Sequence, residues 1–85
     1  MASYRLRFKR SAAKELERLP AKIRRQVARR AGALIDDPRP FGSEKISGAE
    51  KYRLRQGDYR VVYGIDDDQE VVTVFAIGHR RDVYR

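Results

Sequence analysis

The hydrophobic pattern changes character twice along the chain. From Tyr4 to Phe8, apolar and basic residues alternate with a period of two, which predicts a half-buried strand. Apolar residues then recur at helical spacing on both sides of Pro20, and we expect a short helix capped by Ser11 and a longer one that ends at Asp37-Pro38. The apolar positions are Ala12, Leu16 and Leu19 in the first helix and Ile23, Val27, Ala31, Leu34 and Ile35 in the second. Together they form a helical hairpin whose apolar face needs a partner layer.

After the loop at 38–43, the spacing returns to alternation and predicts a sheet. The expected strands are 52–55, 59–65 and 71–77, with turns at Gln56-Gly57-Asp58 and Asp66-Asp67-Asp68-Gln69. The strand at 71–77 is apolar on both faces, as a buried central strand would be, and Gly78 should break it. We predict a single α+β domain over residues 1–85, with an N-terminal strand and an α-helical hairpin packed on a twisted antiparallel sheet of about four strands.

Composition supports a compact domain and narrows the class of partner. An 85-residue chain has room for one core. Its formal net charge of +8 should attract polyanions, and the cations are mostly Arg, whose planar group suits phosphate contacts. The absence of Cys excludes a disulfide framework and a thiolate site. We see no signal peptide or membrane span, so we expect a cytoplasmic protein that does not bind membranes.

Arginines cluster on the predicted strands. Arg53 and Arg55 are two residues apart, so both should project from one face, about 7 Å from each other. A tight turn separates Arg55 from Arg60, and hairpin pairing would bring Arg60 to the same patch. The alternative is an ordinary solvated strand face. We favour an anion site because clustered Arg side chains repel one another unless something anionic is bound.

The C-terminal run Gly78-His79-Arg80-Arg81-Asp82-Val83-Tyr84-Arg85 is a second signal. It holds the only His of the chain and ends near an aromatic on which a nucleobase could stack. Alternatively, Tyr84 covers the core and His79 is a surface residue. The carboxylates at 66–68 and Glu70 are better explained as a solvated turn than as a Mg²⁺ site. We expect no metal and no cofactor.

RNA can be cut without a metal when its 2′-hydroxyl attacks the adjacent phosphorus. The reaction needs a base, an acid for the leaving oxygen and positive charge on the phosphate. The arginines, His79 and Tyr84 could supply these roles.

Two stretches resemble the RelE branch of the RelE/ParE toxins. They are Tyr52-Arg53-Leu54-Arg55-Gln56-Gly57-Asp58-Tyr59-Arg60-Val61-Val62-Tyr63 and Ile77-Gly78-His79-Arg80-Arg81-Asp82-Val83-Tyr84. The likeness extends over nearly the whole chain. It implies the RelE-like fold and the toxin of a type II toxin–antitoxin system, an endoribonuclease that cleaves mRNA in the ribosomal decoding site by the 2′-hydroxyl route without metal.

The resemblance also implies roles for individual residues. Arg60 would stabilise the transition-state phosphate, Arg80 would protonate or stabilise the leaving oxygen, and Tyr84 would stack on a base. Arg55 belongs to the same catalytic set, and the expected RNA-binding residues are Lys51, Arg53, Arg55 and Arg81. Arg53 and Arg55 stand where well-known members carry lysines, and a guanidinium is a poor proton acceptor. His79 is the substitute base that we predict.

The resemblance implies a cognate RelB-like antitoxin that covers the basic face in a hetero-oligomer, with the free toxin monomeric. Three other interpretations remain. A ParE-like toxin would inhibit DNA gyrase by protein contact, a plain RNA-binding module would grip phosphates without reacting, and a degenerate toxin would be inactive.

Overall fold

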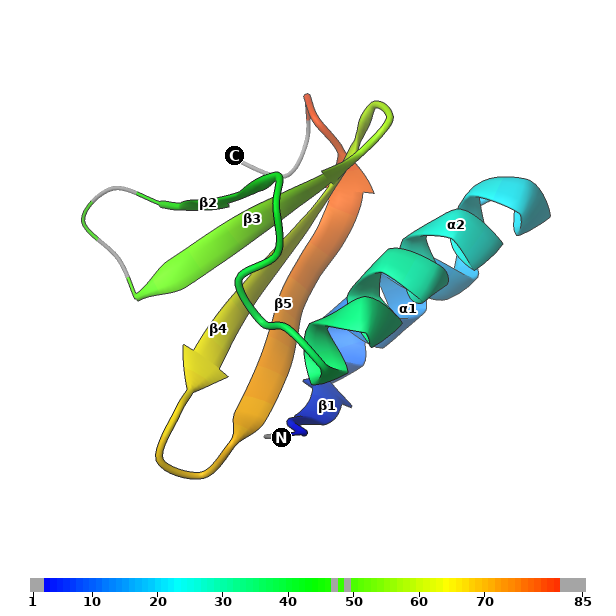
Figure 1. The fold of residues 1–85 in the computed structure, drawn as a ribbon. Coiled ribbons are helices and arrows are strands. Elements are labelled where there is room, and N and C mark those ends of the chain that lie inside the picture. Colours follow the sequence, from blue (N-terminus) through cyan, green and yellow to red (C-terminus); the bar gives the residue numbers. More distant parts are fainter. Residues whose placement is uncertain (1–2, 47, 49, 82–85) are drawn as a thin grey trace.

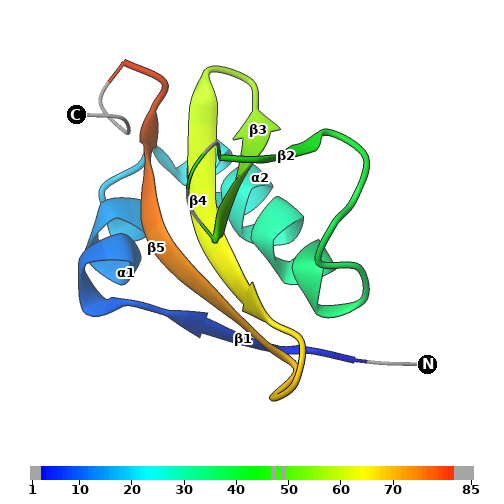
Figure 2. The ribbon, with the colours of Figure 1, turned by 90° about the vertical axis from the view of Figure 1, so that its left-hand side faces the viewer.

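The chain folds into a five-stranded sheet with two helices on one face (Figures 1 and 2). The computed structural model describes residues 3–46, 48 and 50–81. Its elements are β1 (Arg5–Phe8), α1 (Arg10–Glu17), α2 (Ala21–Gly32), a 3₁₀ turn (Ala33–Ile35), β2 (Ser43–Lys45), β3 (Lys51–Gln56), β4 (Tyr59–Asp66) and β5 (Val71–His79). The α+β class and the helical hairpin are as predicted.

The sheet differs from the prediction in two respects. Its order is β1-β5-β4-β3-β2, and β1 pairs with β5 in parallel, so the sheet is mixed rather than wholly antiparallel. The helical hairpin between β1 and the rest of the sheet provides the long connection that allows the first strand to lie parallel to the last. The strand that we did not predict is β2. It is only three residues long and wholly polar, so it has no hydrophobic alternation to detect.

Two local expectations were also wrong. Helix α1 begins at Arg10 after Lys9, and no side chain caps it, so Ser11 lies inside the first turn instead of before it. Strand β5 continues through Gly78 to His79, because Gly78 pairs with Arg60 across the β4–β5 ladder. A glycine weakens a strand but does not end one whose neighbours remain paired.

The core lies between the helices and the face of the sheet that they cover. Leu54, Val61 and Tyr63 are fully buried there, together with Val27 and Leu34 from the helical side. Strand β5 is the second strand of the sheet and is flanked on both sides, which explains why its sequence is almost continuously apolar. Within the described residues, no helix is long and apolar enough to cross a membrane.

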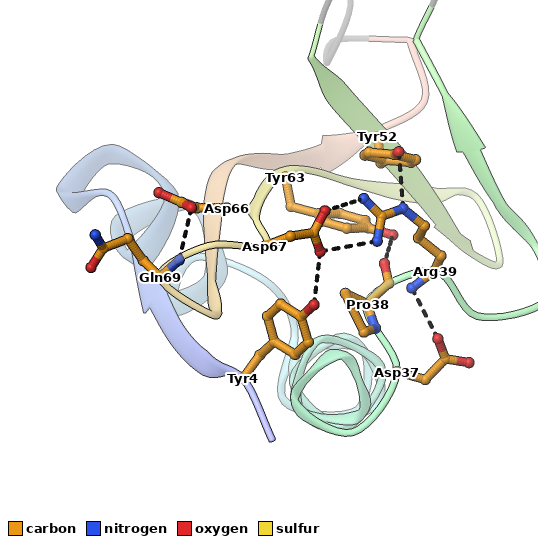
Figure 3. Close-up of polar contacts among 9 residues, drawn as sticks. All are labelled: Tyr4, Asp37, Pro38, Arg39, Tyr52, Tyr63, Asp66, Asp67 and Gln69. Carbon is orange, nitrogen blue, oxygen red and sulfur yellow. Dashed lines mark hydrogen bonds and ion pairs between the residues drawn. The ribbon is translucent and has the colours of Figure 1, made fainter. Parts of the chain in front are cut away.

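A polar network fixes the loop that follows the 3₁₀ turn (Figure 3). Arg39 makes a two-pronged ion pair with Asp67 in the β4–β5 turn, at 2.9 and 3.2 Å, and its Nε donates to the Tyr52 hydroxyl at 3.1 Å. Asp67 also accepts from the Tyr4 hydroxyl at 2.7 Å. The buried Tyr63 hydroxyl donates to the Pro38 carbonyl at 2.8 Å. The loop is therefore held at its start by Tyr52 of β3, Tyr63 of β4 and Asp67 of the β4–β5 turn, and Tyr4, just before β1, in turn holds Asp67.

This network should make stability depend on acid pH. The hydrogen bond from Arg39, and then that from Tyr4, lower the pKa of Asp67. The stabilisation is therefore fully present above the unfolded-state pKa of about 3.9 and is lost as pH falls below it. We expect Asp67→Asn to melt at a lower temperature than wild type at pH 7, with the difference shrinking by pH 3. Thermal melts at both pH values test this, and a difference that did not change with pH would contradict it.

Candidate functional site

Strand β3 divides its side chains between the core and the opposite face. Leu54 is fully buried, whereas Arg53 and Arg55 on either side of it project from the other face. This is the shared face that the spacing of the two arginines predicts.

Arg60 lies directly across from Arg55. The two-residue connection Gly57-Asp58 puts Arg55 and Arg60 opposite each other in the β3–β4 ladder. Gly57 has a φ of 59°, as glycine does at the first central position of a type II′ turn, the tight turn suited to two-residue hairpins. Arg60 is only 9% exposed, and its Nη1 approaches the carbonyls of Gly57 and Tyr59 at 3.5 and 3.3 Å. The predicted convergence of Arg55 and Arg60 is confirmed.

These arginines line a groove of about 830 Å³. It lies at the end of the sheet where the β3–β4 turn stands beside the end of β5 (Figure 2), and the backbone N–H of Arg80 donates to the Asp58 carbonyl at 2.8 Å to join the two. Among the described residues, the groove is lined by six arginines and three other residues: Arg30, Arg53, Arg55, Arg60, Arg80, Arg81, Phe41, Gly42 and Glu44.

The groove is strongly positive, with one acidic side chain among the described residues that line it. Glu44 lies opposite Arg53 in the β2–β3 ladder, and its Oε2 accepts from Arg53 Nη2 at 2.7 Å. That hydrogen bond, together with the charges of Arg53, Arg55 and Arg60, lowers the pKa of Glu44. Arg55 and Arg60 have no ion pair with any described residue. Such a cluster favours a bound polyanion, because paired like charges otherwise oppose folding.

The unfavourable Arg55–Arg60 pair gives a prediction about stability. Like charges directly opposite in an antiparallel pair cost up to about 1 kcal/mol. Arg55→Gln should therefore raise the melting temperature at low salt while weakening RNA binding. The gain should shrink as salt screens the repulsion. Melts at low and high ionic strength provide the test, and a lower melting temperature at low salt would refute the idea that the pair is repulsive.

Two predicted site residues lie away from the groove. His79 pairs with Tyr59 in the β4–β5 ladder, and their rings meet edge to face at 5.6 Å, on the face of the sheet that carries the core. Its Nδ1 accepts from the N–H of Arg81 at 3.3 Å. The ammonium of Lys51 lies 4.7 Å from the centre of the Phe75 ring, outside the groove lining. The structure thus does not bring His79 and Lys51 together with the arginines.

The remaining predicted residues divide as follows. Arg53, Arg55, Arg60, Arg80 and Arg81 all line the groove, whereas Tyr84 lies outside the described residues. No group of three or more potential metal ligands occurs in the described part of the chain.

Sequence reasoning missed the part of the groove lining that comes from α2, the loop after the 3₁₀ turn and β2. Arg30 reaches from α2 to the edge of β3, where its Nη2 lies 3.4 Å from the Arg55 carbonyl. Phe41 and Gly42 come from the anchored loop, and Glu44 from the short strand β2. One signal was available in the sequence. Phe41 is a large apolar residue between Pro40 and Gly42, in a segment that is otherwise typical of a surface loop.

Comparison with known proteins agrees with this geometry. A profile of the ParE toxin of type II toxin–antitoxin systems matches residues 6–84. The chain belongs to the RelE/ParE toxins of these systems. It is 34% identical over 86 residues to Toxin RelG of Mycobacterium tuberculosis, covering 96% of this chain and 97% of RelG. It is 32% identical to the mRNA interferase toxin RelE of Escherichia coli K12, covering 92% and 84%.

The fold is that of the RelE toxins. The RelE–RelB complex from Pyrococcus horikoshii contains a chain that superposes with a TM-score of 0.83 at 28% identity, covering 95% of this chain and 99% of that one. The family match includes all of the described residues that line the groove of this toxin.

Proposed function

We propose that this toxin is an mRNA endoribonuclease that inhibits translation by cutting messenger RNA in the ribosomal decoding site. Cleavage would proceed by metal-independent attack of the 2′-hydroxyl on the adjacent phosphorus. The observation that carries the proposal is the groove, in which Arg55 and Arg60 face each other and neither forms an ion pair with a carboxylate of the described residues. The name of the Escherichia coli relative, mRNA interferase, supports the same reaction class.

The arginines have distinct places in this reaction. Arg60, nearly buried next to the turn of the β3–β4 hairpin, would stabilise the pentavalent phosphate by preorganised charge. Arg80 is fixed beside the β3–β4 turn by its backbone and would stabilise the leaving 5′-oxygen. Arg53, Arg55 and Arg81 would hold neighbouring phosphates, and Tyr84 would stack on a base.

An antitoxin is the expected protein partner. The Pyrococcus horikoshii neighbour is a RelE–RelB complex, and a net charge of +8 suits an acidic segment that folds as it binds. Such a segment would cover the groove and exclude RNA. We propose a monomeric cytoplasmic toxin that is inactive in a hetero-oligomer with a RelB-like protein.

The decisive experiment compares purified toxin on ribosome-bound and free messenger, with mapping of the cut sites and end groups. We expect cuts in the ribosome-bound message only, ending in 2′,3′-cyclic phosphate or its hydrolysis product. Toxin that has been treated with a metal chelator before the assay should cut equally well. Arg80→Ala should lose this activity. Bound but uncut RNA would indicate a plain RNA-binding module, and intact transcripts with gyrase-dependent DNA damage would indicate a gyrase inhibitor.

A further inference from the structure

Cleavage by the 2′-hydroxyl route needs a group that accepts a proton, and the groove offers few. Its guanidiniums stay protonated at any physiological pH and cannot act as bases. The imidazole of His79 lies against Tyr59 on the core face of the sheet. Glu44 is the only described residue of the groove lining that can accept a proton with its side chain. We infer that the Glu44 carboxylate is the general base that takes the proton from the 2′-hydroxyl. This inference rests on the proposed function.

The backbone places Glu44 for this role. It sits in β2, directly opposite Arg53 in the β2–β3 ladder, so strand pairing fixes its Cα relative to the arginine face. The 2.7 Å bond from Arg53 holds Oε2, while Oε1 has no hydrogen-bond partner among the described residues. The side chain is 62% exposed, so an incoming ribose can reach it.

Charge keeps Glu44 in the accepting form. The groups that face it are arginines from three elements, namely Arg53 and Arg55 on β3, Arg60 on β4 and Arg30 on α2, with Arg80 and Arg81 after β5. The hydrogen bond from Arg53, and then the charges of Arg53, Arg55 and Arg60, lower the pKa of Glu44 and favour its ionised form in the free toxin. A bound phosphate would neutralise part of this positive charge and raise the pKa again. The carboxylate would then be a stronger base when substrate is present than when it is absent.

The proposed step balances as follows. The 2′-oxygen attacks phosphorus as its proton passes to a Glu44 oxygen, and the bond from phosphorus to the 5′-oxygen breaks. The 5′-oxygen, stabilised by Arg80, takes a proton from a solvent water. The proton on Glu44 then neutralises the hydroxide that remains. The products are a 2′,3′-cyclic phosphate and a 5′-hydroxyl end, and the carboxylate is restored.

Glu44→Gln separates this role from simple charge neutralisation because the two roles predict opposite signs. Removing one negative charge should tighten binding of an uncleavable RNA, with 2′-deoxyribose at the cut site, by a few fold. If Glu44 is the base, single-turnover cleavage should nevertheless fall by about 10²- to 10⁴-fold. If Glu44 is only a counter-ion to Arg53, cleavage should be equal or faster, and that result would overturn the inference.

A rescue experiment adds a second measurement, the recovery of cleavage on addition of formate. A purely structural role of Glu44 predicts no recovery. Glu44→Ala should regain part of its cleavage rate when formate is added, because a small carboxylate can occupy the vacated space. Arg60→Ala, which lacks a cation, should gain nothing from formate. Failure of formate to rescue a folded Glu44→Ala, together with full activity of Glu44→Gln, refutes the base. Absence of cleavage by the wild-type toxin on ribosomes would instead refute the proposed function.

A separate observation concerns Phe41. It is the exposed large hydrophobic residue of the described chain, with a relative exposure of 101%, and it stands on the rim of the groove. Figure 3 shows how its loop is anchored, by Pro38 to Tyr63 and by Arg39 to Asp67. The exposed ring therefore projects from a fixed backbone. A ring left in water gains none of the stabilisation that burial of its apolar surface would bring.

The structure assigns Phe41 to a nucleobase of the bound RNA. A strand whose phosphates follow the arginines would bring bases to the rim, and an aromatic ring there can stack on any base without sequence preference. Phe41 would thus be a binding platform on the rim of the groove. An apolar side chain of the antitoxin is the competing occupant.

The chain contains no Trp, so one introduced residue reports on this contact. Phe41→Trp should lose fluorescence when the uncleavable RNA is added, whereas Gln69→Trp, in the exposed β4–β5 turn and equal in charge, should not. Phe41→Leu should weaken RNA binding by roughly five- to a hundredfold. Unchanged emission with unchanged RNA affinity would overturn the assignment, as would a change seen with an antitoxin segment alone. Because the assay needs no cleavage, it is independent of the nuclease proposal.

Discussion

Arg60→Ala should reduce single-turnover cleavage by about 10²- to 10³-fold while leaving the fold intact. Removing one preorganised donor to a developing anion has an effect of this size in other enzymes. Arg60 is 9% exposed and has no ion pair with a described residue, so its charge is available to the substrate. Its removal also relieves the repulsion with Arg55, and the melting temperature should not fall by more than a few degrees.

Two matched variants make this test specific. Arg60→Lys keeps the charge but loses the planar fork, so we expect a loss intermediate between alanine and wild type. Arg5→Ala removes a cation from β1, at the edge of the sheet outside the groove, and should cleave within about twofold of wild type because only the general attraction of RNA changes. An Arg60→Ala toxin that cleaved as fast as Arg5→Ala would show that Arg60 is not the phosphate clamp.

The parts of the fold that could be predicted are those with a strong hydrophobic period. Strand β3 alternates and buries Leu54, whereas β4 and β5 carry the apolar runs that bury Val61 and Ile77, and both patterns are visible without a structure. The same alternation places Arg53 and Arg55 on the opposite face. Turn chemistry then brings Arg60 across from Arg55, since Gly57-Asp58 permits only a tight connection. Strand alternation and the tight turn are therefore enough to bring Arg53, Arg55 and Arg60 to one face of the sheet.

The parts that could not be predicted depend on contacts between distant segments. The parallel pairing of β1 with β5 joins residues more than sixty positions apart and has no local signal. Strand β2 has three polar residues and is defined only by its partner β3. Glu44 could therefore not be placed in the groove, although it is the residue that lies opposite Arg53.

The placement of His79 shows how far parity can be used. Ile77 is buried, so in a strand that continues, His79 must face the core and Gly78 the arginines. We expected the strand to end at Gly78. With that boundary, the alternation of side chains along the strand no longer determined which face His79 lies on. The base prediction for His79 therefore depended on a strand boundary, which is among the least reliable features to read from a sequence.

Leu54→Ala should destabilise the toxin by about 2–5 kcal/mol. Leu54 is fully buried in the core cluster at the centre of β3, where the sheet meets the helices. The loss is large because a domain of this length is stable by only about 4–13 kcal/mol. Urea unfolding should show a lower midpoint with an unchanged slope. Leu54→Met, which conserves volume, should cost less than about 1.5 kcal/mol, and a similar cost for alanine would mean that this core is not tightly packed.

The two kinds of loss can be separated, because Leu54 lies between two arginines of the groove without belonging to it. Leu54→Ala should lose cleavage only in proportion to its unfolded fraction. Because RNA binds the folded state, saturating substrate should restore much of its activity by mass action. Arg60→Ala should be folded, so its cleavage should stay about 10²- to 10³-fold below that of wild type at any RNA concentration. If excess RNA left Leu54→Ala as inactive as Arg60→Ala, the groove would depend on core packing more directly than strand alternation implies.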